Sequence, residues 1–113
     1  MKKKKTFKNY NFEFDKNEKK VIKNFCKQAV NQMTGNDNYF KDINVFNSII
    51  EKIDAGTDEV KLTKDETMRI TIQLRENVKH LSNKVKKANI FTRWLYNSAL
   101  KQYNQILTTH FSD

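Results

Sequence analysis

The stretch that decides the fold reads Tyr10-Asn11-Phe12-Glu13-Phe14-Asp15-Lys16-Asn17-Glu18. Its aromatic residues alternate with polar ones, which is the period of a strand with one buried face. Asp15 and Glu18 then have the spacing of a capping box, in which each side chain bonds the backbone N–H of the other at the start of a helix. The stretch predicts a strand near 7–14 that leads directly into a helix near 16–33.

Two helices are predicted by apolar residues at helical spacing. The first set runs from Val21 to Met33 along one stripe, and Thr34-Gly35-Asn36-Asp37 ends that helix. The second set runs from Tyr39 to Ile53 and predicts a helix over about 39–54. Gly56 follows where a helix commonly ends in a left-handed residue.

A second strand-to-helix junction follows at a fixed offset of 48 residues. Val60-Lys61-Leu62-Thr63-Lys64-Asp65-Glu66 repeats the pattern of residues 12–18, with a short strand and another capping-box spacing. The repeat fits an internal duplication, and it also fits the chemistry shared by strand-to-helix junctions in general. Either origin predicts a strand at 60–62 and a third helix that opens at about residue 64.

The C-terminal half is predicted to be helical, with one break. A heptad seam of about three repeats lies in the third helix, at Thr67, Thr71, Leu74, Val78, Leu81, Val85 and Ala88. An apolar stripe in the final helix comprises Phe91, Trp94, Leu95, Ala99, Tyr103, Ile106, Leu107 and His110. One uninterrupted helix would extend ~70 Å, too long for a small domain, so we expect a break near 87–92.

Composition agrees with a compact helical chain. Among 113 residues there are two glycines, no proline and thirteen aromatic residues, so little interrupts regular structure and large side chains are available for one core. The predicted fold is mostly α with a minor β component. It is a small bundle of about four helices with a short two-stranded antiparallel ribbon, in the order β-α-α-β-α-α. We expect a flexible basic tail over 1–6 and a single compact domain over 7–113.

Several classes of protein are excluded by what the sequence lacks. The longest apolar run has three residues and the lysines at the start are followed by no apolar segment, so we expect a cytoplasmic protein without a membrane partner. Cys26, His80 and His110 share no metal-ligand spacing, and Cys26 lies on the apolar stripe of the first helix, as a small core residue would. We therefore expect no enzymatic activity, no metal and no cofactor.

The order of the elements is similar to that of the ribbon-helix-helix family of DNA-binding proteins, in which two strands form an antiparallel ribbon that enters the major groove. The similarity covers most of the chain but is one of topology. The outward positions of the ribbon would be Asn9, Asn11, Glu13, Glu59 and Lys61. Two carboxylates and one cation are unfavourable beside phosphate groups. The chain therefore departs from the family at the outward face of the ribbon, which in that family contacts the bases.

Positive charge is concentrated at the two ends of the sequence. The formal net charge is +9, with +7 in residues 1–28, −4 in residues 29–66 and +6 in residues 67–113. Lys, Asn and Ile together make 42 of the 113 residues, and AT-rich codons favour these three, so base composition accounts for part of the total. Base composition does not explain why the signs are segregated.

The cations of the third helix share one stripe. Counted at 100° per residue from Thr67, Arg75, Lys79 and Lys86 fall at about 80–120°, and Arg93 joins them if the helix persists that far. Tyr96 is the aromatic residue expected to point outward for base stacking, whereas Phe91, Trp94 and Tyr103 are expected in the core. The candidate contacts to an anionic partner are Lys2, Lys3, Lys4, Lys5, Lys8, Arg75, Lys79, Lys86, Arg93 and Tyr96.

Two functions remain open from the sequence. The first is binding of nucleic acid or a nucleoprotein complex through phosphate contacts, without base-specific readout because the chain has only three arginines. The second is inhibition or regulation of a larger protein target, as performed by small phage and plasmid proteins such as anti-CRISPR inhibitors. The cationic stripe on the third helix would also be expected of an ordinary solvent-exposed helix face with no partner. The acidic middle segment could also complement the basic ends of a second copy in a homodimer.

Overall fold

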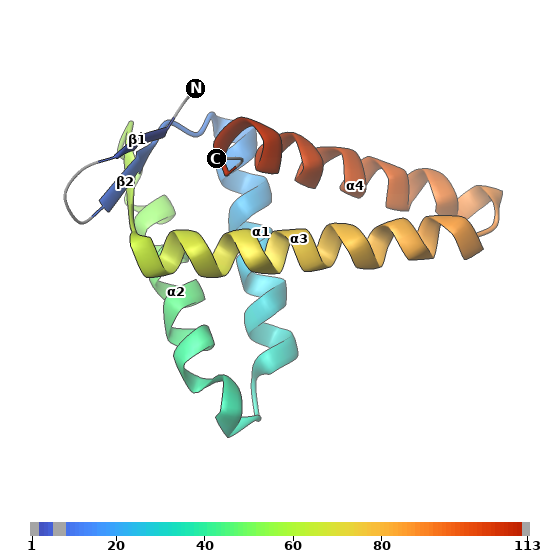
Figure 1. Ribbon diagram of the computed structural model, residues 1–113, viewed down its shortest axis with the longest axis horizontal. Coiled ribbons are helices and arrows are strands. Elements are labelled where there is room, and N and C mark those ends of the chain that lie inside the picture. Colours follow the sequence, from blue (N-terminus) through green and yellow to red (C-terminus); the bar gives the residue numbers. More distant parts are fainter. Residues whose placement is uncertain (1–2, 6–8, 112–113) are drawn as a thin grey trace. The chain divides into compact units, whose positions relative to one another are not determined.

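The computed structural model describes residues 3–5 and 9–111, which form two compact units with their boundary between Ile70 and Thr71. Figure 1 shows the elements of both units. The strands are β1 (Lys3–Lys5), β2 (Asn9–Phe12) and β3 (Val60–Thr63). The helices are α1 (Lys16–Met33), a 3-10 turn η1 (Asp37–Tyr39), α2 (Phe40–Asp54), α3 (Lys64–Lys87) and α4 (Ile90–His110). The predicted mostly helical fold, with four helices and an antiparallel ribbon, is confirmed within these residues.

The ribbon predicted between the two strand regions is present. β2 pairs antiparallel with β3, so that Tyr10 lies opposite Leu62 and Phe12 lies opposite Val60. The sheet also contains a strand that the sequence did not predict, because β1 pairs with the other edge of β2. Part of the segment expected to be a flexible tail is therefore a strand. Lysine is common in edge strands, where its charge discourages further pairing.

Both predicted capping boxes form. At the start of α1, the Glu18 N–H donates to Asp15 Oδ1 (2.7 Å) and the Asp15 N–H donates to Glu18 Oε1 (2.9 Å). At the start of α3, the Glu66 N–H donates to Thr63 Oγ1 (3.0 Å) and the Thr63 N–H donates to Glu66 Oε1 (2.9 Å). The two junctions thus share one local chemistry, in which side chains satisfy backbone donors that a helix start leaves unpaired.

The core of the N-terminal unit lies between the sheet and the first two helices, which pack against each other. The rings of Phe12 and Phe14 stack with centroids 5.2 Å apart. The other large buried side chains of this core are Ile22, Phe25, Phe46, Ile49 and Leu62. Cys26 is fully buried, and burial raises the pKa of its thiol to about 12, as expected of a core thiol rather than a nucleophile.

The C-terminal unit is a hairpin of two antiparallel helices, α4 and the part of α3 that follows Ile70; we call residues 71–111 the α3–α4 hairpin. The predicted break is confirmed: α3 ends at Lys87 and α4 begins at Ile90. Asn89 caps α4, since its Oδ1 accepts from the Thr92 N–H at 3.0 Å. Leu74, Ile106, His110 and Phe111 are buried in this unit, whereas no residue from 75 to 105 is fully buried.

The predicted core of the final helix is partly wrong. Ile106 and His110 are buried as predicted and Tyr103 is half-buried, with burial raising its pKa. Phe91 and Trp94, also assigned to the core, are 80% and 63% exposed. Tyr96, expected to point outward, is half-buried instead. The stripe read from the sequence therefore holds only for the C-terminal half of α4.

Candidate nucleic-acid interface

The α3–α4 hairpin carries an excess of positive charge. Its described residues contain one acidic side chain, Glu76, and seven cations: Arg75, Lys79, Lys84, Lys86, Lys87, Arg93 and Lys101. Residues 9–70, by contrast, contain ten cations and eleven acids. The net charge that the sequence places after residue 66 thus belongs almost entirely to one pair of helices.

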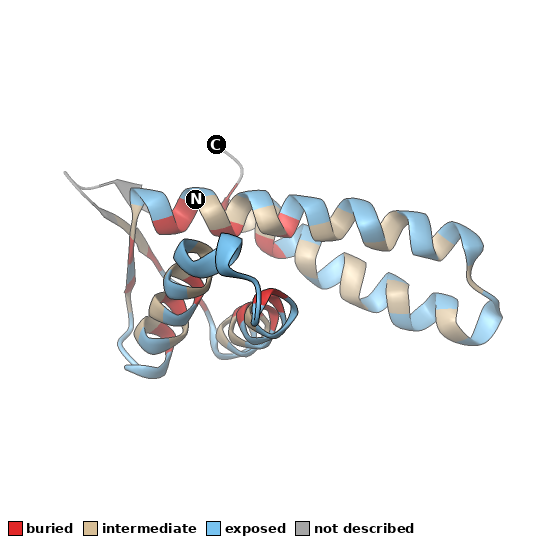
Figure 2. Cartoon of the chain, turned by 90° about the horizontal axis from the view of Figure 1, so that it is seen from below, coloured by how far each residue is buried: buried red, intermediate tan, exposed pale blue. Residues whose placement is uncertain are grey.

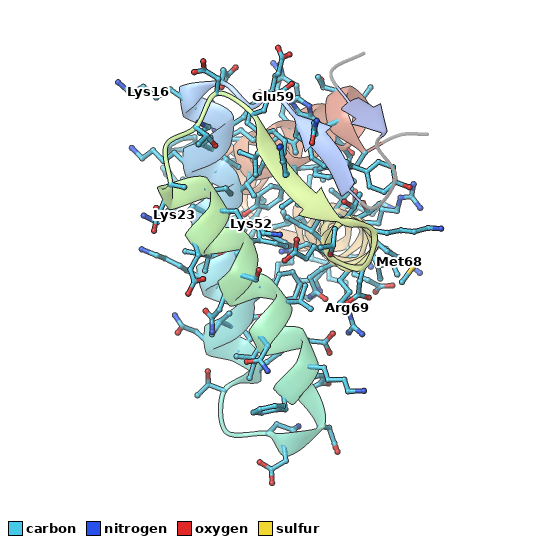
Figure 3. All side chains as sticks on the ribbon, turned by 90° about the vertical axis from the view of Figure 1, so that its left-hand side faces the viewer. Lys16, Lys23, Lys52, Glu59, Met68 and Arg69 are labelled. Carbon is cyan, nitrogen blue, oxygen red and sulfur yellow. The ribbon has the colours of Figure 1, made fainter. Side chains whose placement is uncertain are left out.

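The described ion pairs with carboxylates all lie in the N-terminal unit, where they involve three of the ten cations of residues 9–70. In the N-terminal unit, Lys23 pairs with Asp54 (2.6 Å) and Lys52 with Glu66 (2.6 Å). Arg69 bridges Asp65 (3.1 Å) and Asp42. Figure 3 labels Lys52 and Arg69, which link α2 to the first turns of α3. Among the described residues of the hairpin no cation forms an ion pair with a carboxylate, so their charges stay available to an external anion.

The predicted stripe is present on α3 and stops with that helix. Arg75, Lys79 and Lys86 are all exposed and share one face, over a length of ~16 Å at 1.5 Å per residue. Arg93 is exposed but belongs to α4, where its Nη2 donates to the Ala88 carbonyl at 3.2 Å. Of the predicted basic tail, Lys2 and Lys8 lie outside the described residues, and only the backbone of Lys3–Lys5 is described, as β1.

A cleft of about 560 Å³ lies between the end of α3 and the start of α4. It is lined by polar and basic side chains, among them His80, Asn83, Lys84, Lys87, Asn89 and Tyr96. The Lys84 ammonium lies 5.6 Å from the centre of the Tyr96 ring, within the range of a cation–π contact. Tyr96 thus lines the cleft with Lys84 beside its ring, and its role as a stacking surface stays a prediction.

The sequence analysis missed a feature at the start of α4, where four large apolar side chains are exposed. They are Ile90 (81%), Phe91 (80%), Trp94 (63%) and Leu95 (53%), and we call them the apolar tip. Figure 2 shows the joined ends of α3 and α4 without a buried residue. Lys86 and Lys87 precede the tip in the sequence, and Arg93 lies within it. Clustered exposed apolar residues of this kind commonly mark a binding surface.

Three further findings bear on the function. No group of three or more metal-ligating side chains occurs among residues 9–111. None of the helices that the structure describes has the length and apolar character needed to cross a membrane. No family model, curated protein or solved structure matches this chain. The similarity to ribbon-helix-helix proteins therefore stays one of element order, and the function is argued from the residues themselves.

Proposed function

We propose that this protein binds nucleic acid through phosphate contacts made by the α3–α4 hairpin. The observation that carries the proposal is the charge balance of the described hairpin, which has seven cations against one acid and no ion pair with a carboxylate. Lysine and arginine gain affinity for nucleic acid by releasing the counterions condensed on phosphates. The N-terminal unit also has cations without a carboxylate partner, but residues 9–70 contain eleven acids against ten cations. Because those carboxylates repel phosphate groups, the N-terminal unit is the weaker candidate.

The arrangement of the cations supports extended contact with a backbone. The outer face of α3 offers three cations in a row, and the cleft adds Lys84 and Lys87 from the same helix. Five of the seven hairpin cations are lysines, which contact phosphate as point charges and do not form the planar bidentate pairs that read guanine. The binding proposed here is therefore independent of base sequence.

Removing charge from the hairpin is expected to weaken binding. The test variant carries Arg75→Gln, Lys79→Gln, Lys86→Gln and Arg93→Gln, and its affinity for a labelled oligonucleotide is measured by fluorescence anisotropy at low salt. Because each lost phosphate contact removes its share of counterion release, we expect affinity to fall by about tenfold or more, equally for unrelated sequences.

The matched control loses the same charge from the other unit. Lys16, Lys20, Lys27 and Lys41 are exposed on α1 and α2 and pair with no carboxylate among the described residues. Changing these four lysines to glutamine should alter affinity by about twofold at most, because they lie outside the proposed interface. Equal losses in the two variants would show that net charge, rather than the hairpin, determines binding and would refute the proposal.

A second candidate function is favoured by the apolar tip. Exposed Trp and Phe side chains are enriched at protein interfaces, so the tip also suits regulation or inhibition of a larger protein, including one that handles nucleic acid. The two functions are distinguished by how each complex responds to nuclease, salt and substitution. A protein complex would survive nuclease treatment and physiological salt and would be lost on Ile90→Lys, whereas phosphate binding would be lost in the four-glutamine hairpin variant.

A further inference from the structure

The exposed aromatic rings of the hairpin indicate which form of nucleic acid it binds. We propose that the hairpin binds single strands, with unpaired bases stacked on Phe91 and Trp94. This inference rests on the proposed function and adds the class of ligand to it. Aromatic side chains beside a basic track are the usual means by which proteins hold unpaired bases without reading their sequence.

The geometry of the two rings suits successive contacts with one strand. Phe91 and Trp94 are three residues apart on α4, so their Cβ atoms are ~5–6 Å apart on the same side of the helix. Each ring is mostly exposed, and Ile90 and Leu95 extend the apolar surface around them. A base that stacks here removes its own face and an exposed ring from water together, which is favourable for both.

The charges around the tip favour a strand over other occupants. Lys86, Lys87 and Arg93 lie within four residues of a tip side chain, and Glu76 is the sole acid of the described hairpin. Phosphate groups would accompany every stacked base and meet these cations. Packing of two tips from two copies would instead bring like charges together. A duplex offers its phosphates but keeps its bases stacked on one another, so the two rings would have no base face to contact.

Trp94 makes the inference directly measurable, because it is the only tryptophan in the chain. Titration of the intact protein with a short non-self-complementary oligonucleotide should quench its fluorescence strongly, and the matching duplex should quench it much less. The Phe91→Leu variant keeps an apolar side chain and the Trp94 probe but removes one ring. We expect it to bind the single strand about fivefold or more weakly, with duplex affinity unchanged within about twofold.

The control is Phe40→Leu, which removes an exposed ring (68% exposed) from α2 in the other unit and should leave both affinities unchanged. If duplex and single strand bind equally tightly, and Phe91→Leu and Trp94→Leu leave single-strand affinity unchanged, the stacking inference is wrong while phosphate binding stands. If neither form binds even at low salt, the proposed function itself fails. A protein that binds no oligonucleotide but forms a dimer that Trp94→Lys dissociates would assign the tip to a second copy instead.

Discussion

Replacing Glu66 with alanine should lower the free energy of unfolding by about 3 kcal/mol, measured by urea denaturation at pH 7 with far-UV circular dichroism. Glu66 is 5% exposed and accepts three hydrogen bonds from two elements of the N-terminal unit, α2 and β3. Its Oε1 accepts from Lys52 Nζ (2.6 Å) and the Thr63 N–H (2.9 Å), and its Oε2 accepts from Ser48 Oγ (2.6 Å). One carboxylate therefore joins α2 to the junction between β3 and α3.

The expected loss follows from what alanine leaves behind. Lys52, Ser48 and Thr63 would each lose an acceptor in a part-buried site, where an unsatisfied donor costs about 1–3 kcal/mol. The Lys52 side chain is 34% exposed and can turn toward water, so the loss should fall at the lower end of the range for broken buried pairs. Glu66→Gln keeps one acceptor oxygen and should cost less, about 1–2 kcal/mol.

The same site predicts a dependence on pH. Burial raises the pKa of Glu66, but hydrogen bonds from Lys52, Ser48 and the Thr63 N–H outweigh it, and the pKa lies below its usual value of 4.5. Because the folded-state pKa is lowered, the stabilising contribution of Glu66 is complete above the unfolded value and is lost as the pH falls through the folded one. The stability difference between the wild type and Glu66→Gln should therefore shrink in acid.

A neighbouring carboxylate serves as the control. Asp65 is on the same turn of α3, with a side chain 54% exposed, and it pairs with Arg69 at 3.1 Å. Asp65→Ala should cost about 1 kcal/mol or less, as exposed ion pairs do. If Asp65→Ala and Glu66→Ala were equally destabilising, or if the Glu66→Gln difference persisted unchanged in acid, the junction would not depend on the buried carboxylate.

Phe25→Ala should destabilise the protein by about 3–5 kcal/mol, a large part of the 5–15 kcal/mol typical of a whole domain. Phe25 lies on α1, is 2% exposed and belongs to the core between the helices and the sheet. The substitution removes the transfer free energy of the ring and leaves a cavity that a close-packed core cannot fill. Urea denaturation should show a lower midpoint with little change in slope.

The matched control is the same substitution at an exposed position. Phe40→Ala on α2 should change stability by no more than about 0.5 kcal/mol, because the ring is 68% exposed. If Phe25→Ala does not fold, Phe25→Leu provides the test, with an expected loss of about 1–2 kcal/mol. A loss at Phe40 equal to that at Phe25 would mean that the core is elsewhere.

Much of the N-terminal unit could be predicted because the residues that favour each strand or helix locally are also the ones that its core buries. The alternation around Phe12 predicted β2, and the apolar stripe through Phe25 predicted α1 from Lys16 to Met33. The capping boxes that contain Asp15 and Glu66 marked the starts of α1 and α3. Each of these signals depends on residues a few positions apart, which the sequence states directly.

The apolar tip could not be predicted by the same reasoning. At 100° per residue, counted from Ile90, the tip residues lie at about 0–140°, whereas Ala99, Tyr103, Ile106 and His110 lie at about 160–220°. Phe91 at about 100° and Trp94 at about 40° therefore lie on a different face from His110 at about 200°. Combining the two faces in one stripe assigned Phe91 and Trp94 to the core. A narrower angular window would have separated them. Such a window would not have shown which group is exposed, because that depends on packing.

The strand β1 was missed for a different reason. Lys3–Lys5 shows neither alternation nor β-branched residues, and a sheet edge accepts such a segment through backbone hydrogen bonds alone.

The candidate interface could be predicted in part from the sequence. Arg75, Lys79 and Lys86 were placed together correctly by helical geometry, while the cleft beside Lys84 depends on the turn at Asn89 that brings α4 back along α3.

The salt dependence of binding tests the central claim most directly. The affinity of the intact protein for a labelled single-stranded oligonucleotide is measured by anisotropy across a range of salt concentrations. If four or more hairpin cations contact phosphates, the logarithm of the affinity should fall with the logarithm of the salt concentration with a slope of about −3 or steeper. A flat dependence, or no binding at the lowest salt, would contradict the account.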